Sequence, residues 1–539
     1  MIPPPAEMEK TLEQQVVHFV RPISMGGFGK VDLVCCNRVY FAVKYILCPR
    51  RQDVERLLID EETQFLRQMR TPAIPNTVWA VGSALVYTLP AFANNMRPPA
   101  ANEVYVAIVM PYVSANTLRC QLASLANLGQ RCSSAHVSIV MGGLASFSYA
   151  MYERRRLSHN DFKLGNVLVN SKWSPTVVDF SFVHSAAVRH TQETWKRGTP
   201  CYMAPEHWFF DVPTMWMVNS GNGGTCSVGD TWAMALVWTT MLLTGMPLTD
   251  IDDPLLAARV MSPNHVFNPE YTDTVFDLVP VTTPWLHAVL TEILDREKPP
   301  PDISLNVLYH GVCLMLWYQA LYTGDREVFL PGTDVLPGIE QTPLHVLLSR
   351  HARRITELYR QHGHGLLERA RDEVKRQLSP TEWHAYLRMF AWNPAHRRGV
   401  HDANPFAWLL GVFGANAREL DDRLATAAAA QNNAPPPVPD LFFPANSGGL
   451  AGLIVHAAND GCNVCKAPCQ VQCGICKQKR CSNECLSGHY CQPPVLNGNG
   501  MYNHHHAGRG RGHPPQPPRT RLHNSVNSLL LRVEDGKYY

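Results

Sequence analysis

The sequence has little excess charge and no apolar run long enough for a membrane. Lys and Arg total 48 and Asp and Glu total 45 in 539 residues, a net charge of +3. This balance provides no protein-wide field toward nucleic acid or an anionic membrane, so binding to either would have to be local. The longest apolar stretch, residues 231–243, is shorter than the roughly 20 residues that span a bilayer. We expect it to form a buried helix of a soluble protein.

Signals for secretion and for repeated structure are also missing. The first residues, MIPPPAEMEK, have no basic region followed by an apolar run, which excludes a secretory signal there. We therefore expect an intracellular protein, in the cytoplasm or nucleus, whose cysteines stay reduced. The chain has no internal repeat of fixed period, which excludes a repeat architecture.

Apolar residues and cysteines, by contrast, are plentiful. Hydrophobic residues make up 45% of the chain and charged residues 17%, which suits a large buried core and roughly two to four domains. Eight of the sixteen cysteines lie between Cys35 and Cys313, and eight lie between Cys462 and Cys491. This uneven placement indicates two chemistries in one chain.

The hydrophobic pattern divides the first 416 residues into two parts. Short β-branched and aromatic runs separated by Gly and Asn turns fill residues 16–87, with one helical pattern at 53–69. They predict a small sheet that carries one helix. From residue 118 to about 416 the pattern is mostly helical, with a loop-rich stretch at 159–206. This part predicts a larger helical lobe.

Five segments together resemble the conserved motifs of protein kinases, in the family's order. Residues 24–31 (SMGGFGKV) resemble the loop that covers the phosphates, and residues 41–44 (FAVK) resemble the strand whose lysine grips them. Residues 159–166 (HNDFKLGN) resemble the catalytic loop, residues 179–181 (DFS) the metal-binding triplet, and residues 198–206 (GTPCYMAPE) the end of an activation segment. A glycine-rich turn alone would be a weak signal, but chance agreement of five ordered motifs is negligible. The chain is identified as a member of the protein kinase superfamily.

The resemblance implies a role for each catalytic residue. Asp161 would orient the substrate hydroxyl and accept its proton, and Lys163 would contact the transferred phosphate. Asn166 and Asp179 would hold two Mg²⁺ ions. Phosphoryl transfer spreads negative charge over nonbridging oxygens, so these roles are alignment and charge neutralisation. Lys163, placed two residues after Asp161, and the Gly-Thr pair at 198–199 resemble the Ser/Thr branch.

Lys44 would supply a point charge to the phosphates and needs an acidic partner to hold it. Glu62 fits best, because Phe65 and Leu66 then form the inward face of the helix. Glu61 is the fallback, and a solvated acidic face is the structural alternative.

By the same resemblance, the adenine site lies between two lobes. Residues 109–113 (VMPYV) resemble the hinge, with Met110 as gatekeeper and the backbone of Val113 facing adenine. The side chains that would sandwich the base are Val31, Ala42 and Leu168. Plain core packing of these three is compatible with that role. The full set of implied nucleotide-binding residues is Ile23, Gly26, Gly27, Phe28, Gly29, Val31, Ala42, Lys44, Met110, Val113 and Leu168.

Two later features resemble structural partners of the family. Asp230 begins the buried helix, where it resembles the residue that anchors the backbone of the catalytic loop. Residues 393–397 (NPAHR) resemble a motif whose arginine, Arg397, pairs with Glu206, because a buried carboxylate needs such a partner. The kinase domain would therefore extend to about residue 416, with an unusually long helical expansion at about 248–390.

The chain departs from the family at three positions. Ser24 stands at the first loop glycine, Asn160 stands where Arg usually precedes the catalytic Asp, and Ser181 stands at the Gly of the metal triplet. None removes a catalytic charge. Without that Arg, which usually binds an activation-loop phosphate, phosphorylation at Thr191 or Thr194 should not be required for activity. Ser181 would restrict a flexible backbone position.

The late cysteines have the spacing of zinc ligands. Thiolates two to four residues apart suit tetrahedral Zn²⁺, and eight ligands suffice for two ions. With the sites interleaved as in cross-braced fingers, one ion would be held by Cys462, Cys465, Cys481 and Cys485. The other would be held by Cys473, Cys476, His489 and Cys491, with Cys469 left over. Disulfides or a single zinc site are the alternatives.

Residues 479–485, followed by His489 and Cys491, resemble a MYND-type finger, a small protein-interaction module. The last two ligands are closer together than in that family. Without metal this stretch has too few apolar residues to fold.

The expected fold class is α+β: a two-lobed protein kinase fold followed by a small zinc-stabilised module. The expected divisions are an extension (1–15), the kinase domain (16–416), an Ala/Pro-rich linker (417–460), the MYND-like finger (461–492) and a disordered tail (493–539). Four arginines and no acid lie at 509–521, but we expect a solvated tail there rather than a nucleic-acid contact.

We therefore expect a protein Ser/Thr kinase that uses ATP, Mg²⁺ and Zn²⁺, acts on proteins with Ser or Thr, and recruits a protein partner through the finger. One alternative is a pseudokinase scaffold that binds proteins through the finger. A small-molecule kinase is disfavoured, because residues 198–206 resemble a peptide-binding segment. The irregular motifs and long expansion would suit a kinase of a large DNA virus.

Overall fold

The chain forms two compact units, Met1–Asn459 and Asp460–Tyr539. In the first unit the computed structural model describes residues 18–26, 29–36, 38–48, 66, 74–86, 103–185, 198–209, 226–248, 265–279, 284–322, 342–363, 365–392, 394–397 and 404–414. In the second unit it describes residues 471–472 and 479–480. The expected extension (1–15), linker (417–460) and tail (493–539) lie outside the described residues.

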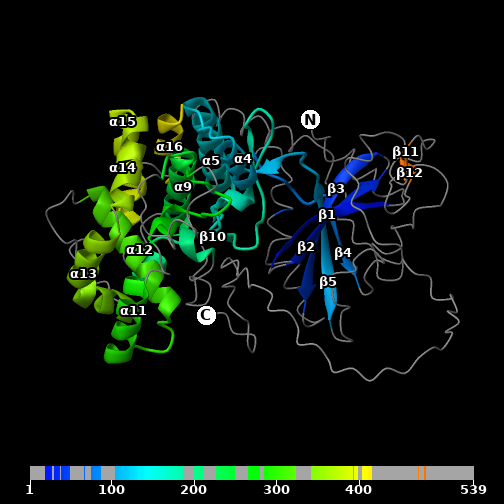
Figure 1. Ribbon diagram of the computed structural model, residues 1–539. Helices are drawn as coiled ribbons and strands as arrows, with labels where there is room; N and C mark the ends of the chain where they lie inside the picture. Colours follow the sequence, from blue (N-terminus) through cyan, green and yellow to red (C-terminus); the bar gives the residue numbers. More distant parts are fainter. Residues whose placement is uncertain are drawn as a thin grey trace, which may run out of the picture. The chain divides into compact units, whose positions relative to one another are not determined.

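The amino-terminal part of the first unit is a five-stranded antiparallel sheet, drawn in blue in Figure 1, with the order β1-β2-β3-β5-β4. Runs of β-branched and aromatic residues form its strands. The strands are β1 (His18–Gly26), β2 (Gly29–Cys36), β3 (Val39–Cys48), β4 (Gly82–Val86) and β5 (Val104–Pro111). The small sheet expected from the sequence is therefore present.

Strand pairing places the expected nucleotide-binding residues on one face of this sheet. Lys44 pairs with Val31 on β2 and with Ile108 on β5. Ala42 pairs with Met110. Because alternate residues of a strand point to opposite faces, Lys44 and Ala42 share a face. Ile108 and the neighbouring β5 residues on that face belong to the main hydrophobic core.

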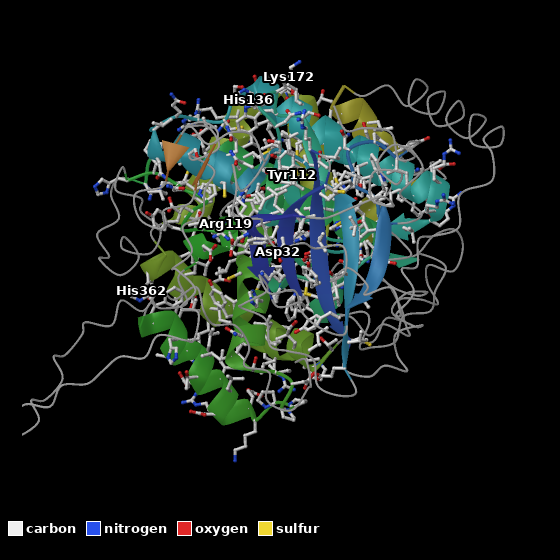
Figure 2. The ribbon with its side chains drawn as sticks, turned by 90° about the vertical axis from the view of Figure 1, so that its right-hand side faces the viewer. Asp32, Tyr112, Arg119, His136, Lys172 and His362 are labelled. Atoms are coloured by element: carbon white, nitrogen blue, oxygen red, sulfur yellow. The ribbon has the colours of Figure 1, made fainter. Side chains whose placement is uncertain are left out.

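The opposite face of the sheet has a small core of its own. Phe41, Val43 and Tyr45 of β3 are buried there. Strand β2 holds a buried ion pair: Lys30 Nζ lies 3.1 Å from Asp32 Oδ1, and both side chains are buried. Figure 2 shows Asp32 within the sheet. Burial raises the pKa of Asp32, and the charge of Lys30 opposes that shift.

Helices make up most of the remaining described part of the first unit. Those of ten residues or more are α4 (Leu118–Asn127), α5 (Ser134–Arg155), α9 (Cys226–Leu243), α11 (Pro284–Glu297), α12 (Leu305–Tyr322), α13 (Pro343–His362), α14 (Leu366–Gln377) and α15 (Pro380–Met389). The shorter ones are α7 (Glu206–Phe209) and α16 (Ala407–Val412). α9 contacts α5, α14 and α15, and its residues 228–243 are all buried. The buried helix predicted at 231–243 is therefore confirmed.

Short strands between β5 and α7 present the expected catalytic segments. β6 (Asn116–Thr117), β8 (Val167–Val169) and β9 (Pro175–Val177) form one small sheet, and β7 (Leu157–Ser158) pairs with β10 (His184–Ser185). Residues 159–166 leave β7 and lead to β8, and residues 178–183 leave β9 and lead to β10. The paired strands therefore bring the catalytic loop and the metal-binding triplet close together.

The expected expansion at 248–390 contains α11 to α15. α12 packs against α11, α13 and α14, and its residues 311–321 are all buried. α15 begins with a capping box, in which Glu382 accepts the backbone N–H of Ser379 at 2.8 Å and Ser379 accepts that of Glu382 at 3.3 Å. These helices extend the core of the lobe. Among the described helices, none has both the length and the apolarity to cross a membrane.

In the second unit the described residues form two short antiparallel strands. β11 (Val471–Gln472) pairs with β12 (Lys479–Arg480), with Val471 opposite Arg480 and Gln472 opposite Lys479. All eight expected zinc ligands lie outside the described residues, so zinc binding stays a prediction.

Candidate active site

The loop after β7 is fixed from below by a buried carboxylate. Asp230, near the start of α9, accepts the backbone N–H of His159 on Oδ2 and that of Asn160 on Oδ1, both at 2.7 Å. Its side chain is buried, and burial, opposed by these two hydrogen bonds, raises the pKa of Asp230 to about 7. Asn160 itself adopts a left-handed backbone conformation with φ 60°, which Asn tolerates better than most residues. The structure thus brings Asp230 to the loop, as the resemblance implied.

Asp161 is held by four donors. Its Oδ1 accepts the backbone N–H of Thr199 at 2.9 Å and the Thr199 hydroxyl at 2.7 Å. Its Oδ2 accepts Lys163 Nζ and Asn166 Nδ2, each at 2.8 Å. Lys163 Nζ also donates to the Thr199 hydroxyl at 2.9 Å. Because an ionised carboxylate offers about four lone-pair positions, these bonds fix both of its oxygens.

The second carboxylate of the site is bound to the sheet lysine. Lys44 Nζ donates to Asp179 Oδ1 at 2.8 Å and to Ser181 Oγ at 2.9 Å. Ser181 Oγ donates to the same Asp179 Oδ1 at 2.7 Å. Burial acts to raise the pKa of Asp179, but Lys44, the Ser181 hydroxyl and the charge of Lys163 outweigh it and lower that pKa to about 2. Asp179 is therefore a carboxylate at any physiological pH.

Aromatic packing fixes the backbone next to Asp179. Phe180 is buried, and its ring centroid lies 5.3 Å from His159 and 6.2 Å from Phe147. Phe162 packs on the same two rings, at 4.8 and 6.0 Å. Burial lowers the pKa of His159, so its ring stays neutral. The cluster connects the catalytic loop with the segment that carries Asp179.

The expected adenine-facing residues are half-buried. Val31, Ala42, Met110 and Leu168 all have intermediate exposure, and Leu168 lies on β8. At the end of β5, the N–H of Tyr112 donates to the carbonyl of Tyr40 at 3.2 Å, and Figure 2 labels Tyr112. One residue further, the carbonyl of Val113 accepts the N–H of Ala115 at 3.0 Å. Within the described part of the chain, the N–H of Val113 donates to no acceptor.

The turn between β1 and β2 is closed by the pair Gly26 and Gly29. Gly29 has φ 146°, and a Cβ there would lie 2.1 Å from the carbonyl oxygen of Tyr45, so this position requires glycine. Ile23, on β1, is 39% exposed. The two residues at the tip, Gly27 and Phe28, lie outside the described residues.

A bidentate ion pair connects the end of the activation segment to residues 394–397, which come late in the sequence of the lobe. Arg397 Nη1 and Nη2 donate to Glu206 Oε1 and Oε2 at 2.7 and 2.5 Å, and both side chains are fully buried. Arg397 also donates to three backbone carbonyls, including that of Ala391 at 2.7 Å. The pair expected from the sequence is present.

Several expected positions fall outside the described residues. They are Phe65, Glu61 and Glu62 of the helix at 53–69, Thr191 and Thr194 of the activation segment, and Asn393. Leu66, four residues after Glu62, is helical and buried, and its carbonyl accepts the N–H of Ala80 at 3.0 Å.

The contacts of three residues were not predicted from the sequence. The Thr199 hydroxyl bonds to both Asp161 and Lys163, the Ser181 hydroxyl bonds to Asp179, and Asn160 Nδ2 donates to the carbonyl of Phe182 at 3.1 Å. Thr199 lies in one of the motifs, and Ser181 and Asn160 are departures from the family. Their contacts depend on how the segments meet, which the spacing does not reveal.

The residues present suit a magnesium nucleotide. Asn166 uses its amide nitrogen on Asp161, so its carbonyl oxygen is the atom that could ligate a cation. Both donors to Asp179 bind Oδ1, and within the described residues Oδ2 has no partner. One carboxylate and one amide oxygen, completed by phosphates and water, are what Mg²⁺ commonly takes from a protein. Among the described residues no group of three His, Cys, Asp or Glu side chains is placed to hold a metal on its own.

Comparison with known proteins gives one family. A model of the protein kinase domain matches residues 17–297, more than half of the chain. A probable serine/threonine-protein kinase, CCRP1 of Zea mays, is 30% identical over 130 residues, which cover 23% of this chain and 18% of that protein.

Two further relatives match over similar segments. The putative serine/threonine-protein kinase/receptor R826 of Acanthamoeba polyphaga mimivirus is 24% identical over 185 residues, 34% of this chain and 10% of that protein. The cysteine-rich receptor-like protein kinase 8 of Arabidopsis thaliana is 26% identical over 134 residues, 22% of this chain and 20% of that protein. The alignments thus cover a fifth or less of each relative's length. From the family match, together with the sheet and the site geometry, we conclude that this chain belongs to the protein kinase family and carries a kinase domain, which implies use of ATP and Mg²⁺.

Proposed function

We propose that the chain is a protein Ser/Thr kinase that transfers the γ-phosphate of ATP to protein hydroxyls. The observation that carries the proposal is the pairing of two acidic side chains with two lysines. Asp161 is paired with Lys163, Asp179 is paired with Lys44, and each pair lies at 2.8 Å. This is the charge pattern that phosphoryl transfer needs, since the reaction is accelerated mainly by alignment and by neutralising developing negative charge.

In this proposal each carboxylate has one task. Asp161 binds the substrate hydroxyl and accepts its proton, and Lys163 neutralises charge on the transferred group. Asp179 and the carbonyl oxygen of Asn166 would hold Mg²⁺, which when bound would supply positive charge to neutralise the phosphates. Lys44 binds the α- and β-phosphates, with Glu62 as its acidic partner.

The nucleotide would bind on the inner face of the sheet. Met110, Val31, Ala42 and Leu168 would contact the base, and the N–H of Val113 would donate to it. The backbone around Gly26, Gly27, Phe28 and Gly29 would approach the phosphates, with Ile23 beside them. The half-buried state of the base-contacting side chains supports this placement, as does the N–H of Val113, which has no acceptor among the described residues.

The contact between Lys163 and Thr199 supports the Ser/Thr assignment. Thr199 reaches Asp161 and Lys163 together, so the peptide-binding end of the activation segment is attached to the catalytic loop. The names of two relatives include serine/threonine-protein kinase. A small-molecule kinase would not need this attachment.

Radiolabelled phosphate transfer to a generic basic protein tests the proposal. The wild type should label the substrate in the presence of Mg²⁺ and ATP. Asp161→Asn and Asp179→Ala should each lower the rate by at least about 100-fold. Lys172→Ala, an exposed substitution in the turn between β8 and β9, is the control and should keep full activity. A folded wild type that transfers no phosphate would instead support the pseudokinase scaffold, which binds proteins through its finger.

We further propose that the second unit binds zinc and recruits a protein partner or substrate. The pairing of Gln472 with Lys479 brings together the two ends of the connection 473–478, which carries Cys473 and Cys476. A closed connection of this kind suits two thiolates of one tetrahedral site. The proposed sites are Cys462, Cys465, Cys481 and Cys485 for one ion, and Cys473, Cys476, His489 and Cys491 for the other.

Elemental analysis of the purified chain tests the zinc proposal. Two equivalents of zinc are expected for a MYND-like module at 461–492, and one equivalent would indicate a single site. A chain that contains no zinc after purification without chelators would contradict the proposal. Cys469→Ser, which removes the one late cysteine without an assigned role, is the matched control and should keep the metal content.

A further inference from the structure

The hydroxyl of Ser181 lies between the two charged groups of the nucleotide site. It accepts a hydrogen bond from Lys44 Nζ at 2.9 Å and donates one to Asp179 Oδ1 at 2.7 Å. Lys44 and Asp179 are also bonded directly, at 2.8 Å. The three groups therefore form a closed triangle, in which one oxygen of Asp179 receives two donors.

The hydrogen bonds of this triangle determine which oxygen of Asp179 faces the nucleotide site. The terminal torsion of an Asp side chain is soft, so hydrogen bonds rather than rotamer preference set the direction of its two oxygens. Both donors are on Oδ1, and Oδ2 has no partner among the described residues. A hydrogen bond between a hydroxyl and a carboxylate is short and about twice as strong as a neutral one. Oδ1 is thus occupied by hydrogen bonds from Lys44 and Ser181, and Oδ2 is available to a cation.

The backbone holds Ser181 in place for this task. On one side Asp179 has φ 66°, and the ring of Phe180 is buried against His159 and Phe147. On the other side the carbonyl of Phe182 accepts Asn160 Nδ2 at 3.1 Å. Because both neighbours are fixed to the catalytic loop, the Ser181 hydroxyl has a defined position relative to Lys44.

We propose that Ser181 is a positioning residue for the magnesium nucleotide: its hydroxyl fixes Asp179 Oδ1 and Lys44 so that Oδ2 points to the cation. The inference rests on the proposed function, because it assumes that Asp179 ligates Mg²⁺. Removal of the hydroxyl frees the carboxylate to rotate and takes one acceptor from Lys44. Both changes weaken the response to Mg²⁺ and leave the fold intact.

The test is a Mg²⁺ titration of the binding of fluorescently labelled ADP to the full chain, which does not depend on turnover. In Ser181→Ala the Mg²⁺ concentration at half-saturation should rise about tenfold, the effect of losing one hydrogen bond to a charged group. Ser181→Thr keeps the hydroxyl and should restore the wild-type value. Ser181→Gly, the residue usual in the family, should match Ser181→Ala, because neither has the hydroxyl. Ser138→Ala, on the exposed side of α5, is the control and should not change the titration.

Lys44 provides a second readout that does not involve metal. Without nucleotide, an amine-acylating reagent should modify Lys44 several times faster in Ser181→Ala than in the wild type, as followed by mass spectrometry, because the amine has lost one of its acceptors. Unchanged Mg²⁺ titrations in both Ser181→Ala and Ser181→Gly, or a failure of Ser181→Thr to restore the titration, would overturn the inference. A wild type that binds no labelled ADP at any Mg²⁺ concentration would overturn the proposed function instead.

Discussion

At the scale of single residues, the site depends on side chains and backbone conformations that their hydrogen bonds and neighbours hold fixed. Asp161 has a donor for each of its four lone-pair positions, and Asn160 and Asp179 both keep left-handed backbone conformations. Such conformations cost about 1–3 kcal/mol each and persist only where the surroundings determine them. Here Asp230, the aromatic cluster and Lys44 supply those surroundings.

Gly29 offers a direct test of this local constraint. Gly29→Ala should lower the free energy of unfolding by about 2–4 kcal/mol, because the new Cβ would lie 2.1 Å from the Tyr45 carbonyl oxygen at a φ of 146°. Urea denaturation measures the loss. Gly411→Ala, in α16, is the control, since a Cβ there meets no atom within 4 Å. Equal stability of the two variants would show that the turn between β1 and β2 relaxes freely.

Sequence alone identified the charged residues of the site but not how they are held. Lys44, Asp161 and Asp179 could be predicted because the chemistry requires their charges at those places in known motifs. The donors from Thr199 and the Ser181 hydroxyl could not, because each depends on two segments that meet only in the fold. Ser181 was expected to matter through its backbone, and the structure instead gives its side chain two partners.

At the scale of elements, the start of the activation segment is fixed by a strand pair and by an amide hydrogen bond. β10 pairs with β7, and Asn160 Nδ2 donates to the carbonyl of Phe182. The resemblance implies at position 160 an arginine that would bind a phosphate of the activation segment. The amide of Asn160 instead holds the segment through a neutral hydrogen bond.

The second prediction therefore concerns phosphorylation. A double variant, Thr191→Ala with Thr194→Ala, should keep activity within about threefold of the wild type, because no phosphate partner is needed. Asn160→Ala should lower kcat by about tenfold through loss of the hydrogen bond to Phe182. Rates of phosphatase-treated proteins check both. Loss of turnover in the double variant, with its unfolding temperature unchanged, would contradict the prediction.

Two histidines, the buried His345 and the half-buried His310, make the contact between α7, α12 and α13 sensitive to acid. His345 on α13 is 1% exposed, and neither of its ring nitrogens has a hydrogen-bond partner among the described residues. His310 on α12 stacks on Trp208 with 5.6 Å between ring centroids. Burial lowers the pKa of each to about 4, below the usual value of about 6.5.

The third prediction follows from the sign of these shifts. Below about pH 6.5 these two histidines bind protons in the unfolded chain, whereas in the folded chain they bind protons only near pH 4. The free energy of unfolding therefore falls as the pH is lowered from about 6.5 to about 4. We expect a loss of about 1–2 kcal/mol per histidine between pH 7 and pH 5. His345→Leu should reduce this loss, as measured by urea denaturation at the two pH values. An equal pH dependence in the variant and the wild type would exclude His345 as a cause.

At the scale of the whole molecule, the kinase lobe continues beyond the segment that the family model matches. That match ends at residue 297, within α11, yet Leu409 and Leu410 of α16 belong to the main core. The late motif was predictable because residues 393–397 resemble a motif of the family whose arginine pairs with Glu206. The second core on the outer face of the sheet was not, because burial of both faces cannot be read from the strand pattern. The helices of the expansion were expected, but their packing around α12 depends on contacts between segments far apart in the sequence.

The last prediction tests whether the late segment is part of the kinase fold. Arg397→Met should lower the free energy of unfolding by about 3–5 kcal/mol, because it leaves the carboxylate of Glu206 buried without its bidentate partner. The double variant Glu206→Gln with Arg397→Met should recover part of that loss, since it leaves no buried charge. Chemical denaturation of both variants measures the difference. If the single variant is within about 1 kcal/mol of the wild type, residues after 297 do not hold the activation segment and the kinase fold ends earlier.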